Sequence, residues 1–465
     1  MASTVDTTAT AGGRRDLAPP VADHADNPDN PDHADHVRRR HHGVVVAVVV
    51  GAIVRFGWLA YARPEPVSDF RHYLRLAISL LDTGMFGVGH PSAWRLPAYP
   101  LVLAAGAAVD RDPLALSALT ATISVAQVGL TYLVAWRIFR RRSSAIVAAM
   151  TAAIAPAFVT FAPVLASEHL LAVFVLAAVG TALRSRPNRW WIAAALTGVL
   201  TGAAILTRGE ALAYLPVIAL VVGLERAAAR HGRRRSLATA ATTLVAAALV
   251  VAPWVVRNER VVGHGAGLTT TGGFNFYLAH SPGGYGWRTP LPLPLRITDE
   301  LTRDEVGWRY GLRYARRHPA HWWPTVRHGT HELLAPSTYA ASYATVRHDT
   351  DLGRVVARDD LGLRATAIDL AGRSSRWLLW LGAIGLAAVG VWRRTGLLAV
   401  GGIAAANWVL YAVVFWAQAR YRFVVDALAC VAVGALPAAA AALVHRARSG
   451  AGSPRQLVHA LFTSR

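Results

Sequence analysis

Runs of about twenty apolar residues, separated by short arginine-rich segments, recur along most of this chain of 465 residues. A helix of about twenty residues crosses the hydrocarbon core of a membrane, and in lipid a single segment satisfies its backbone polar groups only as a helix. Together with a hydrophobic content of 54%, these runs predict an all-α polytopic membrane protein with about ten transmembrane helices. The predicted spans are residues 43–61, 113–139, 145–161, 170–183, 190–206, 211–224, 237–256, 377–391, 397–416 and 423–444.

The arginines between the spans indicate how the chain is oriented. Basic residues in short loops mark the cytoplasmic side of a membrane, and here they occupy every second loop. This pattern predicts a protein of the cytoplasmic (inner) membrane with both termini in the cytoplasm. The net charge of +21 then reflects topology and contacts with membrane lipids, whose headgroups are often anionic. Because no basic patch interleaved with aromatic residues is present, nucleic acid is excluded as a partner.

The spans also divide the chain into segments. Residues 1–40 have almost no large apolar side chains to bury, so we expect a disordered cytoplasmic tail there. The other expected segments are an N-terminal transmembrane module (41–256) that includes the first outer loop (62–112), an extracytoplasmic loop subdomain (257–375), C-terminal transmembrane helices (376–445) and a second cytoplasmic tail (446–465).

The first outer loop is longer and more polar than a simple return into the membrane requires. Its apolar spacing predicts a helix that starts near Asp69 and ends at Gly84, and a proline-rich turn with Arg95 and Tyr99 follows. A carboxylate beside apolar surface favours an active-site loop. The competing interpretation is that Asp69 is only a helix N-cap.

Ionisable residues that are not topology signals gather at the predicted outer ends of the spans. Such residues are costly at membrane depth and usually functional, so their position on one side predicts a single site at the outer leaflet. Arg55, near the middle of the first span, is the main exception. The residues of this set are Asp69, Arg95, Glu168, His169, Arg208, Glu210, Arg257, Asn258, Arg420 and Arg422.

Five segments carry a family resemblance in the same order along the chain. They are PVSDFRHYLRLAISLLDTGMFG with AWRLPAYPLVLA in the first outer loop, SEHLLAVFVLA (167–177), LTRGEALAYLP (206–216), PWVVRNERVVGHGAGLTTTGGFNFYLAHSP (253–282) and QARYRFVVDALA (418–429). The chain resembles polyprenyl-phosphate-sugar glycosyltransferases of the GT-C fold. These include the dolichyl-phosphate-mannose–protein mannosyltransferases and the bacterial lipid A aminoarabinose transferases.

The resemblance implies a polyprenyl-phosphate-linked sugar as donor and leaves the acceptor open between protein, lipid and glycan. It implies that Asp69 is the general base and that Glu168 is the acidic residue of the second outer loop. Many relatives carry two adjacent acids in the first loop, whereas Phe70 follows Asp69 here. No cofactor is therefore certain, and a divalent metal remains open, as does a metal site at His348, Asp349 and Asp351.

The chemistry of the implied reaction selects the remaining candidates. A leaving lipid phosphate is already a stable anion, so it requires cations rather than a general acid, and arginine holds phosphate oxygens at two points. Arg420 and Arg422 are the first choice for the donor phosphate, with Arg95, Arg208 and Arg257 as weaker candidates. Further candidates for the site are Tyr99, His169, Glu210, Asn258 and Tyr421.

Two other functions remain open at this point. One is a transporter or flippase of polyprenyl-linked or related lipids, and the other is an inactive GT-C-like scaffold. A transporter is expected to show internal repeats and charges near the middle of the membrane. Clear repeats are absent from the sequence, and most of its non-topological charges lie at span ends. The single cysteine, Cys430, leaves no disulfide within one chain.

Overall fold

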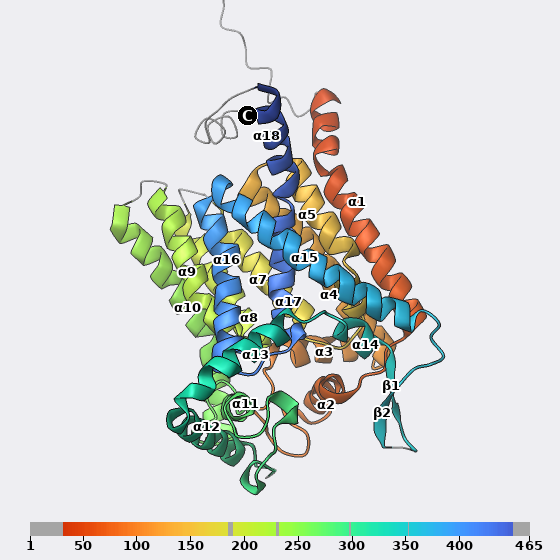
Figure 1. The fold of residues 1–465 in the computed structure, drawn as a ribbon, viewed down its shortest axis with the longest axis vertical. Helices are drawn as coiled ribbons and strands as arrows, with labels where there is room; N and C mark the ends of the chain where they lie inside the picture. The colour runs from red at the N-terminus through yellow and green to blue at the C-terminus, as the bar shows by residue number, and fades with distance from the viewer. Residues whose placement is uncertain (1–30, 185–188, 229–231, 297–298, 352, 450–465) are drawn as a thin grey trace, which may run out of the picture. The chain divides into compact units, whose positions relative to one another are not determined.

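Helices dominate the computed structural model, which describes residues 31–184, 189–228, 232–296, 299–351 and 353–449 (Figure 1). The apolar helices are α1 (Pro31–Ala62), α4 (Pro113–Phe139), α5 (Arg142–Ile154), α6 (Pro156–Phe161), α7 (Glu168–Ala182), α8 (Trp190–Thr207), α9 (Ala211–Ala228), α10 (Gly232–Val261), α15 (Arg364–Trp392), α16 (Arg394–Trp408), α17 (Phe423–Val433) and α18 (Leu436–Ser449). The remaining helices and strands are α2 (Ser68–Thr83), α3 (Ala98–Ala107), α11 (Gly272–Ala279), α12 (Glu300–Arg317), α13 (Trp322–Leu334), α14 (Tyr339–Ala344), β1 (Val346–Asp349) and β2 (Arg354–Ala357).

The predicted fold class is confirmed: the chain is an all-α multi-pass membrane protein. The count of ten spans is not confirmed, because some predicted spans coincide with shorter helices, such as α7 with 15 residues. Among the described residues, six helical segments are long and apolar enough to cross a membrane. They are His42–Ala62, Pro113–Phe139, Trp190–Thr207, Gly232–Val261, Arg394–Val414 and Ala419–Ala441.

Parts of the predicted tails and loops lie outside the described residues. These parts are residues 1–30 of the N-terminal tail, residues 450–465 of the C-terminal tail, and the loop arginines Arg186 and Arg230. Helix α1 begins at Pro31, within the segment predicted as a tail. The described residues from Val44 onward belong to one compact unit, and the candidate site lies within it.

The predicted span 145–161 is interrupted at Pro156, where α5 ends and α6 begins. Proline has no N–H to donate and clashes with the preceding turn, so carbonyls before it lose their helical partners. Arg55 of α1 supplies donors at this break, since its Nη2 donates to the Ala152 carbonyl at 2.9 Å and its Nη1 to the Ala153 carbonyl at 2.7 Å. Its Nε also donates to Ser124 Oγ at 2.7 Å. The buried charge inside the first span therefore stabilises a broken helix.

Close helix packing in the core depends on small residues. Gly198 and Gly202 of α8 lie four residues apart and face α10. A Cβ at Gly198 would lie 2.3 Å from the Thr243 carbonyl oxygen, so only glycine permits this approach. Lipid tails compete equally for apolar surface, and transmembrane helices therefore associate through such close contacts. This packing holds the end of α8, where Arg208 follows, in a fixed position.

The helix predicted in the first outer loop forms with nearly the predicted limits. Helix α2 ends at Gly84, whose φ of 68° is the left-handed conformation that glycine adopts readily. Helix α12 begins after Asp299, whose side chain accepts a hydrogen bond from the Thr302 amide at 2.7 Å. In Figure 1, α2 and the helices α11–α13 lie at the same end of the bundle.

Candidate active site

A cavity of about 560 Å³ lies between the end of the helix bundle and the helices that cover it. Its walls come from segments far apart in the chain: the first predicted outer loop, the end of α8, the start of α9, α11 and the segment around 410–421. The charged residues in its lining are Asp69, Arg95, Arg208, Glu210 and Arg420. The cavity therefore brings together residues that the sequence predicted at the ends of different spans.

Asp69 lies in the first turn of α2 and carries two ion pairs. Its Oδ1 accepts from Arg95 Nη2 at 2.5 Å, and its Oδ2 accepts from Arg420 Nη2 at 2.9 Å. Burial alone raises the pKa of Asp69, but the charges of Arg95 and Arg420 lower it more, to about 2. The carboxylate is therefore fully ionised at neutral pH, with a guanidinium on each oxygen.

Asp69 does not cap its helix, because the N-cap position is Val67 and no side chain bonds there. The preceding residue, Ser68, has a φ of 49°, which is unusual for any residue other than glycine. Left-handed backbone costs about 1–2 kcal/mol in such residues. This strained entry into α2 coincides with the position of the candidate base.

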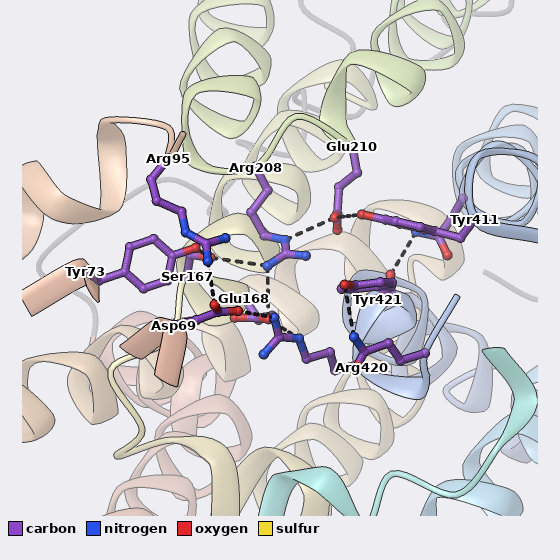
Figure 2. Close-up of polar contacts among 12 residues, drawn as sticks. Asp69, Tyr73, Arg95, Ser167, Glu168, Arg208, Glu210, Tyr411, Arg420 and Tyr421 are labelled. Atoms are coloured by element: carbon purple, nitrogen blue, oxygen red, sulfur yellow. Dashed lines mark hydrogen bonds and ion pairs between the residues drawn. The ribbon is translucent and has the colours of Figure 1, made fainter. Parts of the chain in front are cut away.

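Arginines and carboxylates alternate behind Asp69 (Figure 2). Glu168, at the start of α7, is 2% exposed and accepts from Arg208 Nη1 at 3.0 Å. The same carboxylate lies 3.7 Å from Arg420 Nε, and Arg208 Nε also donates to Glu210 Oε2 at 3.0 Å. Three carboxylates therefore balance three guanidiniums, and the cluster carries no excess positive charge in the absence of a ligand.

Glu168 is absent from the cavity lining, unlike Asp69 and Glu210. Its contacts are with the arginines, which it holds from behind. This geometry fits a positioning role better than direct contact with a substrate. Glu168 therefore stands as a candidate that orients Arg208 and Arg420.

Tyr411 is a cavity residue that sequence reasoning missed. Its hydroxyl donates to Glu210 Oε2, and its ring stacks on Tyr421 with centroids 4.6 Å apart. Tyr411 lies in a short π-helix, Val409–Val414, a widened turn that often marks functional sites. The sequence offered only a tyrosine near the outer end of an apolar run, which is common at membrane interfaces and therefore uninformative.

The cavity lining is also rich in aromatic residues. Trp94, Phe274, Trp287 and Trp416 line the cavity, and the centroids of Trp287 and Trp416 lie 5.5 Å apart in an edge-to-face arrangement. Trp287 is 68% exposed, a large area of apolar surface to leave open to water. Flat aromatic faces of this kind fit a ring-shaped ligand such as a sugar.

Arg422, predicted to bind phosphate beside Arg420, does not line the cavity. Its Nε donates to Asp426 Oδ1 at 3.0 Å, and its Nη groups donate to the Leu333 carbonyl, to the Ala335 carbonyl at 2.5 Å and to Ser337 Oγ at 2.8 Å. All its donors therefore hold the segment between α13 and α14 against α17. The geometry does not support a phosphate-binding role for Arg422.

Four further predicted residues also lie away from the cavity. Arg257 donates to the Ser92 and Phe86 carbonyls at 2.8 and 2.9 Å, which fixes the first outer loop. Asn258 donates to the Gly267 carbonyl, Tyr99 bonds to Thr120, and His169 bonds to Gln127. Each of these side chains joins two segments of the fold, although the Nε2 of His169 is buried without a hydrogen-bond partner.

The described residues offer no ready-made cluster of ligands for a divalent metal. Within the described parts of the chain, His, Cys, Asp and Glu form no group of three or more with the geometry to hold a metal ion, and this includes the predicted cluster at His348. At the cavity, Asp69, Glu168 and Glu210 each accept from arginine instead. Charge in this site is balanced by guanidinium groups.

Comparisons with known proteins bear on both the fold and the sequence. Residues 105–260 match the sequence model of the dolichyl-phosphate-mannose-protein mannosyltransferase family. The structure superposes on the archaeal oligosaccharyltransferase AglB from Archaeoglobus fulgidus, solved with an inhibitory peptide and a dolichol-phosphate, with a TM-score of 0.50 and 15% identity over 91% of this chain and 52% of AglB. The chain has the GT-C fold.

The predicted family resemblance is thereby confirmed. An apo structure of the Archaeoglobus oligosaccharyltransferase also matches, with a TM-score of 0.50 and 14% identity over 90% of this chain and 53% of that one. ArnT from Cupriavidus metallidurans bound to undecaprenyl phosphate matches with a TM-score of 0.43 and 19% identity, over 89% of this chain and 81% of ArnT. The GT-C chain spans about half the length of the oligosaccharyltransferases it matches. No curated protein sequence matches it.

Proposed function

We propose that this GT-C protein transfers a sugar from a polyprenyl-phosphate carrier to an acceptor at the outer face of the cytoplasmic membrane. The observation that carries the proposal is the cavity in which two carboxylates and three guanidiniums meet at the end of the apolar helices. The matched family, which acts with dolichyl-phosphate-mannose by its name, and the dolichol-phosphate in the AglB structure support this class of donor. The acceptor is a hydroxyl or amine of a protein, lipid or glycan.

The lining of the cavity divides into three parts that match the parts of such a donor. Leu212, Ala213 and Leu410 form an apolar side at the level of α9 and the π-helix, where a prenyl chain is accommodated. The arginines bind the phosphate. The aromatic residues around Trp287 receive sugar rings, from the donor or from a glycan acceptor.

Asp69 acts as the general base in this proposal. It takes the proton of the acceptor hydroxyl or amine, whose oxygen or nitrogen forms the new bond to the anomeric carbon. The bond from that carbon to the phosphate oxygen breaks, and the polyprenyl phosphate leaves with the electron pair. Arg420 and Arg208 stabilise the charge that develops on the leaving phosphate. A separate general acid is unnecessary because the leaving group is a stable anion.

The arginine-rich loops, which lie at the end of the helices opposite to the cavity, support the proposed orientation of the protein in the membrane. The face that carries α2 and α11–α13 lies outside, where nucleotide sugars are not available. A donor that arrives through the membrane is therefore the chemically consistent one.

Bond cleavage distinguishes the proposal from the transporter alternative. Purified protein in lipid nanodiscs is incubated with polyprenyl-phosphate-linked radiolabelled sugar and with membranes from the source cells as acceptor. We expect the label to move into an acceptor fraction while free polyprenyl phosphate accumulates. A flippase moves the intact lipid across a bilayer, so reorientation of uncleaved donor in proteoliposomes, without release of polyprenyl phosphate, would contradict the proposal.

A further inference from the structure

Both oxygens of the Asp69 carboxylate are occupied by the groups that the donor phosphate needs. Arg95 holds Oδ1 and Arg420 holds Oδ2, and both arginines line the cavity. A base needs a free oxygen to receive a proton, and a phosphate needs free guanidinium donors. The ligand-free arrangement leaves some guanidinium N–H groups without a hydrogen bond, such as the Nε groups of Arg95 and Arg420, but it leaves neither oxygen of Asp69 without a guanidinium. At least one arginine therefore moves off the carboxylate before Asp69 acts as a base.

The surroundings of the two arginines differ. The Arg420 side chain is 9% exposed, starts from a short 3-10 helix, and has Glu168 at 3.7 Å from its Nε as a second anionic neighbour. The Arg95 side chain is 22% exposed and belongs to an irregular stretch between Pro91 and Pro97. Asp69 is its only ion-pair partner among the described residues, whereas Arg420 lies near both Asp69 and Glu168. Moving Arg95 away from Asp69 therefore breaks fewer interactions with carboxylates than moving Arg420.

We propose that Arg95 transfers from Asp69 to the donor phosphate, so that donor binding uncovers the carboxylate for the acceptor while Arg420 stays in place. This inference rests on the proposed function and adds an order to it: the donor binds first, and the base becomes competent only then. One ion pair breaks and one forms, so the net charge of the cluster changes only by that of the phosphate.

The charges that face Asp69 come from several elements and set the direction of its response. They are His72 of α2, Arg95 of the loop after it, Arg208 after α8, Arg420 and Tyr421 near the start of α17, and Glu168 of α7 behind Arg420. With Arg95 on the carboxylate, the pKa of Asp69 is about 2, too low for an efficient base near neutral pH. Loss of this one cation and arrival of the phosphate anion both raise that pKa.

A structure with undecaprenyl phosphate tests the transfer directly. We expect the Arg95 guanidinium within hydrogen-bond distance of the phosphate and more than about 4 Å from Asp69, with the contact from Arg420 to Asp69 retained. A bound phosphate with Arg95 still on Asp69, or with Arg420 displaced instead, would overturn the inference. Failure of undecaprenyl phosphate to bind the cavity at all would instead count against the proposed function.

Binding constants provide the test in solution. If Asp69 competes with the phosphate for Arg95, Asp69→Asn binds undecaprenyl phosphate tighter, by about threefold to tenfold for a partly exposed competing pair. Arg95→Gln binds it more weakly, and most of the gain from Asp69→Asn disappears in the double variant. Asp82→Asn is the matched control, because Asp82 lies at the other end of α2, paired with Arg111 at 2.7 Å, and outside the cavity lining.

The double variant separates the transfer from simple repulsion. If Asp69 only repels the phosphate, its removal tightens binding equally with and without Arg95, and this result would refute the transfer. A gain that requires Arg95 supports it. A loss of affinity in Asp69→Asn would mean that Asp69 helps to place the arginines for binding, which also contradicts the inference.

Discussion

Arg420 and Arg422 are two residues apart, and the structure predicts opposite effects for their substitution. Arg422 is 2% exposed and its guanidinium bonds to Asp426, two backbone carbonyls and Ser337. Arg422→Met leaves the Asp426 carboxylate buried without a cation, with only the Ser337 hydroxyl beside it, and leaves both carbonyls without this donor. Breaking a buried pair in this way costs about 3–5 kcal/mol, so we expect a large fall in thermal stability.

Three variants measured side by side in detergent by thermal unfolding test this expectation. The double variant Arg422→Met with Asp426→Leu removes the stranded charge and should recover part of the loss, since only the carbonyls remain unpaired. Arg420→Met should unfold closer to wild type, because its partner Asp69 keeps Arg95 and is 28% exposed. Donor binding should be lost in Arg420→Met and kept in folded Arg422→Met. A stable Arg422→Met that fails to bind donor would refute the assignment.

Three further outcomes follow from the same geometry. Arg420→Lys keeps the charge but lacks the planar fork that reaches both Asp69 and Glu168, so the Kd for undecaprenyl phosphate should rise by about tenfold, with Arg111→Lys as the control. Thr350→Cys, in the exposed turn between β1 and β2, should react with a membrane-impermeant thiol reagent in intact cells. Ser143→Cys, exposed near the start of α5, should react only after permeabilisation, and the reverse pattern would invert the proposed orientation. The pKa of Asp69 falls from 3.8 to about 2 on folding, so its ionisation stabilises the folded protein above about pH 4, and this contribution disappears towards pH 2. The unfolding temperatures of wild type and Asp69→Asn should therefore converge only in that acidic range.

Much of the fold was predictable because its determinants are local. The limits of α2 follow from one amphipathic stripe and from Gly84. Hydropathy averaged over a span does not register a single proline, so the sequence predicted one helix over 145–161 where Pro156 makes two. Arg55, whose side chain stabilises this break, lies about one hundred residues away in sequence. The sequence of the first span shows a charge at this position but does not show which segment it contacts.

The sequence predicted where the candidate site lies better than it predicted which residues line it. Ionisable residues at span ends pointed to Asp69, Arg208 and Arg420, which the cavity brings together. Arg420 and Arg422 looked equivalent because both flank Tyr421. They lie in a 3-10 helix of three residues per turn, where side chains two residues apart leave in directions about 120° from one another. One therefore faces the cavity and the other faces the protein interior.

Turnover of Asp69→Asn at saturating polyprenyl-phosphate-linked donor tests the central claim most directly. Asparagine keeps the size and much of the hydrogen bonding but accepts no proton, and loss of a positioned base costs about 10²–10⁴-fold in rate. We predict a loss of that size in a protein that unfolds at a near-normal temperature and still binds undecaprenyl phosphate. Near-normal turnover in folded Asp69→Asn would contradict the account, because no other carboxylate of the first loop lines the cavity within the described residues.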